Sequence, residues 1–289
     1  MSHHHHHGQN NIKTAFFLNL AFTILEFFGG IYVNSIAIIS DALHDLGDSL
    51  SLGLSWYLDN KSKKDATNTF TFGYKRFSLL GALINSLVLI VGSIFIIRES
   101  FMRLFEPEFS DAKGMMIFAI IGVLVNGYAA FKLSHGKTLN EKVISWHLIE
   151  DVLGWAAVLV ASIIMMFWET PYLDPALSIL ITLYILWNVI KRLKETLMIF
   201  LQASPKEIDE QEITAKIKAL PHVASIHHVH IWSLDGEKHV FTAHIKLKEV
   251  AGFDEVLLLK KELRTLLKAY PFSHHTIEVE LPEEICAMD

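Results

Sequence analysis

Two segments of this 289-residue chain carry a histidine followed four residues later by an aspartate, each inside a long apolar run. The first reads SDALHDLGD, with His44 and Asp48, and the second reads SWHLIED, with His147 and Asp151. Because residues four apart share a helix face, each pair points to one side of its helix. Two imidazoles and two carboxylates form an N₂O₂ set that suits tetrahedral Zn²⁺, with Cd²⁺ or Co²⁺ as alternatives.

Ionisable side chains are costly in such an apolar setting. One acid or base at the centre of a membrane costs about 2.5–3.5 kcal/mol, so several together cost on the order of 10 kcal/mol. They persist where they face a water-filled cavity, pair with one another or bind an ion. One His-x-x-x-Asp pair is compatible with a polar network that only locks helices together, whereas the same pair on two segments favours an ion site.

Further acids lie in the same apolar segments. Asp41 falls on the helix stripe of the first pair, three residues before its histidine, and Asp45 lies just beside that stripe. A charge at such depth usually faces a pathway. We therefore predict that four acids surround the ligands or line the path of the ion: Glu26, Asp41, Asp45 and Asp174.

The composition indicates a membrane protein. Hydrophobic residues make up 52% of the chain and charged residues 19%, below the quarter or so that is typical of soluble domains. Crossing a bilayer takes about 20 apolar residues. Six stretches qualify: 12–33, 35–58, 78–104, 112–134, 143–168 and 175–200. We predict an all-α six-helix transmembrane bundle over residues 12–203, after a histidine-rich tail at residues 1–11 that is either native or a purification tag.

Charges between the predicted spans indicate their orientation. Lys and Arg concentrate on the side of both termini, whereas WETPYLDPA, between the last two spans, has neither. By the positive-inside rule, both termini are cytoplasmic. A net charge of −6 argues against a nucleic-acid partner. A single cysteine, Cys286, excludes an intramolecular disulfide and suits a reducing compartment.

Residues 204–289 have the composition of a soluble domain. Amphipathic helical patterns and alternating strand patterns follow in the order α-β-β-α-β, which predicts a small α+β domain with helices on one face of a sheet. Asp235-Gly236 is a hairpin-turn dipeptide between the first two strands. Strand alternation puts His228 and His230 on one face and His227 on the other.

Five motifs together resemble the cation diffusion facilitator family, most closely its bacterial zinc, cadmium and cobalt efflux branch and the vesicular zinc transporters. They are HDLGD, FGYKRFSLLGALIN, HLIED, LDPALSI and HVHIWSL. The resemblance implies a homodimeric, proton-coupled exporter of divalent metal with a ferredoxin-like cytoplasmic domain, and we expect it in a bacterial inner membrane. It implies the same transport ligands that helix geometry selects, and a second metal site near the dimer contact formed by His230, His244 and Glu280.

Two other functions compete with transport. A membrane metal sensor or structural zinc-binding protein would place the main role in the C-terminal histidines. An intramembrane metallohydrolase commonly needs His-Glu-x-x-His and an open coordination position; that string is absent, so we predict no enzyme activity. The chain also lacks a phosphate-binding loop. A proton gradient is the expected energy source, because protons and Zn²⁺ compete for imidazole and carboxylate groups.

Overall fold

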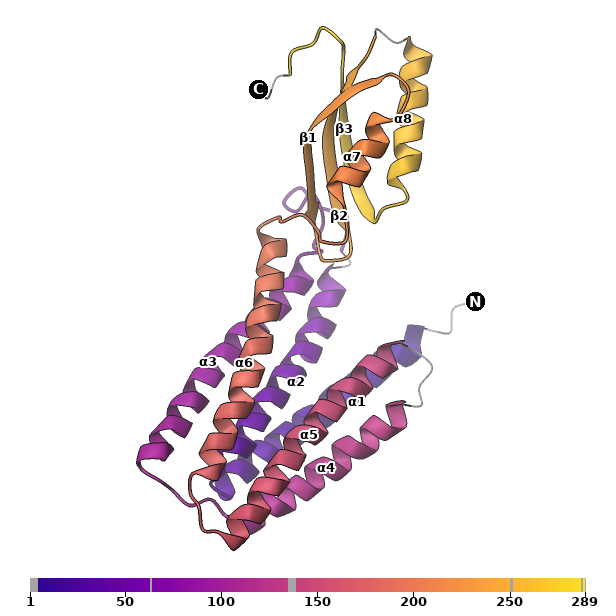
Figure 1. Ribbon diagram of the computed structural model, residues 1–289. Helices are drawn as coiled ribbons and strands as arrows, with labels where there is room; N and C mark the ends of the chain where they lie inside the picture. Colours follow the sequence, from indigo (N-terminus) through magenta and orange to yellow (C-terminus); the bar gives the residue numbers. More distant parts are fainter. Residues whose placement is uncertain (1–4, 63, 135–138, 250–251, 287, 289) are drawn as a thin grey trace. The chain divides into compact units, whose positions relative to one another are not determined.

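The chain folds into two compact units, whose helices and strands are drawn in Figure 1. The computed structural model describes residues 5–62, 64–134, 139–249, 252–286 and 288. Residues 1–59 and 81–193 form a helical unit, and residues 60–80 and 194–289 form a C-terminal unit. Residues 1–4, part of the predicted histidine-rich tail, lie outside the described residues.

Long helices make up the helical unit, and each overlaps a predicted apolar stretch, although α1 begins within the residues predicted to be a tail. Their bounds are α1 His5–Tyr32, α2 Ile36–Ser62, α3 Phe77–Phe105, α4 Ala112–Ser134, α5 Leu139–Phe167 and α6 Leu173–Phe200. Within the described residues, α3 to α6 contain the four stretches that are long and apolar enough to cross a membrane. The apolar stretch found among the described residues of α1, Asn19–Tyr32, is shorter.

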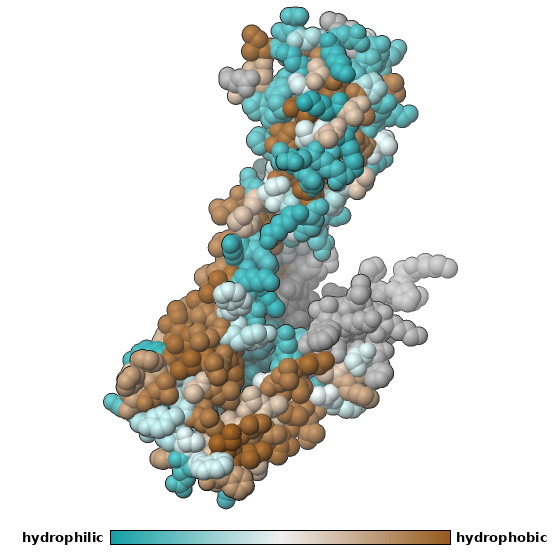
Figure 2. Space-filling view, in the orientation of Figure 1, coloured by the Kyte–Doolittle hydropathy of each residue, from teal (hydrophilic) through white to brown (hydrophobic). Residues whose placement is uncertain are grey.

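Hydrophobic side chains cover much of the helical unit, as Figure 2 shows for one face. On α4, Ile117, Leu124 and Phe131 are 56%, 64% and 67% exposed. Residues seven apart share a helix face, so these three form an apolar stripe on the outside of the unit. Such a surface would promote aggregation in water, and lipid is the solvent that suits it.

Close packing of α4 against α5 helps position the predicted ligands on α5. A methyl group at Gly122 would lie 2.2 Å from the ring of Trp155, well inside van der Waals contact. Glycine therefore lets the two helices approach, and Trp155 is only 1% exposed beside the buried Met115. Since Trp155 lies one helical turn after Asp151, this contact restrains the rotation of the ligand-bearing helix.

The C-terminal unit has the predicted order of elements. These are α7 Glu210–Lys218, β1 Val223–Ser233, β2 His239–Leu247, α8 Phe253–Leu267 and β3 Phe272–Glu280. The sheet order is β1-β2-β3, with β1 antiparallel and β3 parallel to the central β2. Gly236 in the β1–β2 turn has φ of 98°, which glycine adopts without strain, so the predicted hairpin turn is confirmed.

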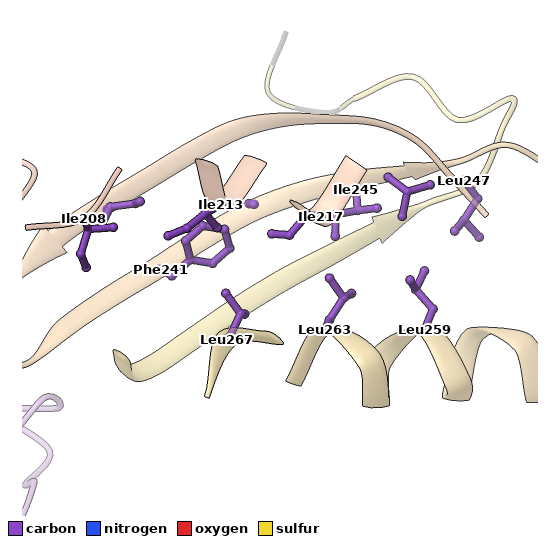
Figure 3. Close-up of a cluster of buried hydrophobic side chains, with 12 residues drawn as sticks. Ile208, Ile213, Ile217, Phe241, Ile245, Leu247, Leu259, Leu263 and Leu267 are labelled. Atoms are coloured by element: carbon purple, nitrogen blue, oxygen red, sulfur yellow. The ribbon is translucent and has the colours of Figure 1, made fainter. Parts of the chain in front are cut away.

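Both helices of this unit bury an apolar stripe against the sheet, as Figure 3 shows. The buried residues of the helices recur every four positions, which keeps them on one helix face. They are Ile213 and Ile217 of α7 and Leu259, Leu263 and Leu267 of α8. On β2, Ala243, Ile245 and Leu247 face this core. The alternate residues His244 and Lys246 therefore lie on the opposite face of the sheet.

Candidate metal centre

Helices α2 and α5 bring the two predicted His-x-x-x-Asp pairs together. His147 Nε2 lies 2.7 Å from Asp48 Oδ2. His44 Nε2 lies 3.8 Å from Asp48 Oδ2 and 3.8 Å from Asp151 Oδ1. His147 Nε2 lies 4.0 Å from Asp151 Oδ2. We call these four residues the helix site. Each of its histidines lies close to an aspartate of both helices, so the site is a single group rather than two separate pairs.

The separations suit one small tetrahedral cation. Zn–N and Zn–O bonds of about 2.0–2.1 Å at tetrahedral angles place the ligand atoms about 3.3–3.4 Å apart. The observed distances between histidine nitrogens and aspartate oxygens run from 2.7 to 4.0 Å, on both sides of that value. His44, Asp48 and His147 each offer a ligand atom within 4.8 Å of the other two. Asp151 presents a different oxygen to each histidine, so this carboxylate must turn before it can complete a Zn²⁺ shell.

The helix site faces a cavity of about 520 Å³. The cavity is lined by α2, α3, α5 and α6, and its lining extends along the C-terminal half of α6 to Asn188 and Arg192. The side chain of Asp151 is 10% exposed and that of His147 is 35% exposed. Water or an ion can therefore reach the ligands, which offsets the cost of placing charged groups in this unit.

Three of the other predicted acids lie around α2 in different surroundings. Asp41 is 7% exposed and lines the cavity beside the helix site. Asp45 is equally buried but is not one of the residues that line the cavity. Glu26 of α1 is fully buried and lies close to the side chain of Asp45. Asp41 is thus placed to meet an ion in the cavity, whereas Asp45 and Glu26 lie outside it.

Asp174, the fourth predicted acid, caps the start of α2. Its Oδ2 accepts a hydrogen bond from Ile36 N at 2.8 Å, and its Oδ1 accepts from Ser35 Oγ at 2.5 Å and Ala37 N at 3.3 Å. The first backbone N–H groups of a helix have no intrahelical partner and favour a negative charge. The structure therefore places Asp174 at the N-terminus of α2, which satisfies its buried charge. Its predicted role beside the ligands or along the ion path stays a prediction.

The chain matches two family models over most of its length. Residues 12–201 match a model described as the cation efflux transmembrane domain, and residues 205–282 match the cytoplasmic domain of cation efflux proteins. The chain belongs to the cation efflux family. This membership confirms the family resemblance predicted from the motifs and makes the chain an integral membrane protein.

Relatives of this cation efflux protein match it over nearly their full length. The metal cation efflux system protein CzcD of Cupriavidus metallidurans is 33% identical over 96% of this chain and 88% of its own. The cadmium, cobalt and zinc/H(+)-K(+) antiporter of Bacillus subtilis is 30% identical over 97% of this chain and 92% of its own. A solved structure, the metal-bound C-terminal domain of the CzcD transporter, matches at 32% identity and covers 26% of this chain and 100% of its own, with a TM-score of 0.23. Both full-length relatives are named as transport proteins rather than enzymes.

This cation efflux protein has a second group of metal-ligating side chains, on the sheet of its C-terminal unit. His244 Nδ1 lies 2.9 Å and His227 Nε2 lies 3.1 Å from Glu280 Oε1. Cys286 Sγ lies 3.6 Å from His244 Nδ1. One ligand atom from each of these four residues lies within 4.8 Å of the other three. We call these residues the sheet cluster.

Glu280 is the most buried member of the sheet cluster, at 3% exposed. Burial raises the pKa of Glu280, but hydrogen bonds with His244 and Cys286 and the nearby His227 outweigh it and hold the pKa below its usual value. An ionised carboxylate beside two imidazoles and a thiol is a donor set that fits a divalent cation. The sheet cluster is therefore chemically suited to hold a metal.

Sequence reasoning placed His230 in this group, and the structure does not. A bulge interrupts β1 between His227 and His230, where His228 has φ of 47°. Because a bulge adds a residue, side-chain alternation reverses beyond it. His227 pairs with His244 and His230 pairs with Thr242 on the same face of β2, so the prediction that His227 and His230 face opposite sides is wrong. His230 lies farther along the sheet and lines a separate pocket.

Two members of the sheet cluster, His227 and Cys286, were missed from the sequence. Strand alternation excluded His227, since nothing in the residue pattern marks the bulge. Cys286 is the single cysteine of the chain and lies six residues after Glu280. That spacing was a usable signal, but whether the segment after β3 turns back toward β2 is a property of the tertiary structure.

Proposed function

We propose that this chain exports divalent metal cations, with Zn²⁺ as the preferred substrate, by proton-coupled antiport. The observation that carries the proposal is the helix site, in which four nitrogen and oxygen donors from α2 and α5 converge beside a cavity. The names of the relatives support it, since one is a metal cation efflux protein and the other exchanges cadmium, cobalt and zinc for H⁺ and K⁺.

The side chains of the helix site couple the two ions by competition. Zn²⁺ needs neutral imidazoles and ionised carboxylates, so metal entry releases protons and proton entry releases metal. A hydrogen bond between His147 Nε2 and Asp48 Oδ2 joins two of the four donors, and an incoming ion would replace it. Rocking of the helices would expose the site to each side of the membrane in turn.

The proposal includes a specific architecture. All of α1 to α6 cross the membrane, both termini are cytoplasmic, and the membrane is a bacterial inner membrane. Residues 12–203 form the membrane domain, and residues 204–289 form a ferredoxin-like domain through which two chains dimerise. Its α-β-β-α-β order and the match to the family's cytoplasmic-domain model support this assignment. Along α6, the cavity lining extends to Asn188 and Arg192, near the predicted cytoplasmic end, which supports a site open to the cytosol.

Zinc flux into proteoliposomes tests the proposal. In vesicles with an acidic lumen, the purified chain should carry Zn²⁺ inward while protons leave down their gradient. The rate of zinc uptake should fall when an ionophore collapses the pH gradient. Asp151→Ala should move none. Zinc flux that does not depend on the pH gradient would contradict proton coupling.

A membrane metal sensor or structural zinc-binding protein is the second candidate, favoured by the sheet cluster. Its Glu280 and His244 side chains are 4% and 12% exposed, which suits a retained ion better than one in transit. Deleting residues 205–289 separates the two functions. A transporter should keep part of its zinc flux, whereas a sensor should lose its function.

A further inference from the structure

The segment after β3 folds back onto the sheet and carries a thiol to the sheet cluster. Glu284 N donates a hydrogen bond to Leu281 O at 3.1 Å, and Leu281 N donates to the Glu284 carboxylate at 2.9 Å. Lys246 Nζ on β2 donates to Glu284 O at 3.0 Å. These bonds form a turn that ends at β2, so the approach of Cys286 to His244 is supported by a folded segment.

The position of the sulfur matches that of a metal ligand. A tetrahedral zinc with Zn–S of about 2.3 Å and Zn–N of about 2.0–2.1 Å places sulfur and nitrogen about 3.6 Å apart. Cys286 Sγ and His244 Nδ1 are 3.6 Å apart.

Neighbouring groups orient the histidine toward the cluster. His244 Nε2 lies 3.6 Å from Glu278 Oε2, its partner on β3. Metal-binding histidines commonly direct the second ring nitrogen to a carboxylate, which fixes the ring and the tautomer. With Nε2 directed to Glu278, Nδ1 is the nitrogen that faces Glu280 and Cys286.

We propose that the Cys286 thiolate is the fourth ligand of a metal site formed with His227, His244 and Glu280, so that this site binds thiophilic divalent cations such as Zn²⁺ and Cd²⁺. The inference rests on the proposed metal-binding role of the C-terminal domain. A thiolate disfavours Mg²⁺, Ca²⁺ and Mn²⁺, which prefer oxygen ligands. The sheet cluster therefore differs in chemistry from the helix site, which contains no sulfur, and its metal ties the C-terminal segment to β2.

Cobalt spectroscopy on the full chain tests the proposal. Cys286 is the single cysteine, so any thiolate-to-metal charge-transfer band in the near ultraviolet reports this residue, and the N-terminal histidines cannot produce one. Co²⁺ added to the reduced, detergent-solubilised chain should produce the band, and Cys286→Ser should lose it. In His227→Ala and Glu280→Gln, the Co²⁺ concentration for half-maximal intensity should rise about tenfold or more. His230→Ala, on the same strand, is the matched control and should leave that concentration unchanged.

Two results would overturn the proposal. One is the absence of a charge-transfer band in the unaltered chain at saturating Co²⁺. The other is a band whose half-maximal concentration is the same in His227→Ala and Glu280→Gln as in the unaltered chain, because the thiolate would then bind metal elsewhere.

Equilibrium dialysis of Zn²⁺ in an Asp48→Ala background identifies which assignment fails. Zinc binding that depends on His227 without a band rejects only the thiolate, whereas no such binding rejects the C-terminal metal site as well. Zinc flux in proteoliposomes tests the proposed transport function independently of the thiolate ligand and of the C-terminal metal site.

Discussion

The helix site and the sheet cluster use similar side chains in contrasting surroundings. In the helix site, the side chains of His44 and Asp48 are 28% and 24% exposed and border a cavity. In the sheet cluster, Glu280 and His244 are 4% and 12% exposed beneath a folded chain segment. An open site exchanges its ion readily, whereas a buried site with its ligands pre-positioned retains it. The contrast suggests that one group handles the transported ion and the other holds an ion in place.

The largest expected effect concerns the helix site. Asp48→Ala or Asp151→Ala should reduce zinc flux in proteoliposomes to the level of protein-free vesicles, because the remaining donors no longer close a tetrahedral shell. Glu106→Gln is the matched control, since this exposed carboxylate is neither a ligand nor one of the residues that line the cavity. Zinc flux near the unaltered rate in Asp151→Ala would refute the assignment.

The sheet cluster should respond to metal through stability. Zn²⁺ at about 1,000 times its dissociation constant should raise the free energy of unfolding of the C-terminal unit by about 4 kcal/mol. Thermal melts followed by circular dichroism, with and without a chelator, measure this difference. His227→Ala should remove most of the gain and His230→Ala should not. Equal gains in the two variants would mean that the ion binds elsewhere.

A third variant tests a carboxylate that belongs to neither metal site. Asp174→Ala removes the cap of α2 and leaves its buried donors unpaired, which should lower the free energy of unfolding of the helical unit by about 2–4 kcal/mol. Denaturation in detergent micelles measures the loss, and Asp174→Asn should lose less because it keeps one acceptor. Zinc affinity of the folded variant should be unchanged. If Asp174→Ala instead lowered zinc affinity strongly and left the free energy of unfolding unchanged, Asp174 would line the path of the ion.

The smallest effect is expected at Asp45, which neighbours a ligand in sequence but does not line the cavity. Asp45→Asn should reduce zinc flux by less than about tenfold, which corresponds to less than about 1.4 kcal/mol. Asp41→Asn, at a cavity-lining position, should have the larger effect in the same flux assay. The reverse order would show that the surroundings of Asp45 and Glu26 matter more to transport than the cavity wall does.

The two sites also differ in how far the sequence could predict them. Helical periodicity is regular, because hydrogen bonds within the helix hold each residue near 100° from the last. Pairs four residues apart on α2 and α5 therefore predicted a shared face, and the structure brings the two faces together. Strand alternation has no such internal restraint. The extra residue in the β1 bulge reverses the alternation, so His227 lies on the same face of the sheet as His244.

The sequence by itself determined the membrane helices, the α-β-β-α-β order and the family, because these depend on apolar length, local periodicity and motif order. It also indicated which residues of α2 and α5 share a helix face and could bind one ion together. Only the tertiary structure decided that Asp174 caps α2, that a bulge turns His227 toward Glu280, and that the chain after β3 brings Cys286 to His244. Those outcomes depend on contacts between residues far apart in the chain, which no local pattern encodes.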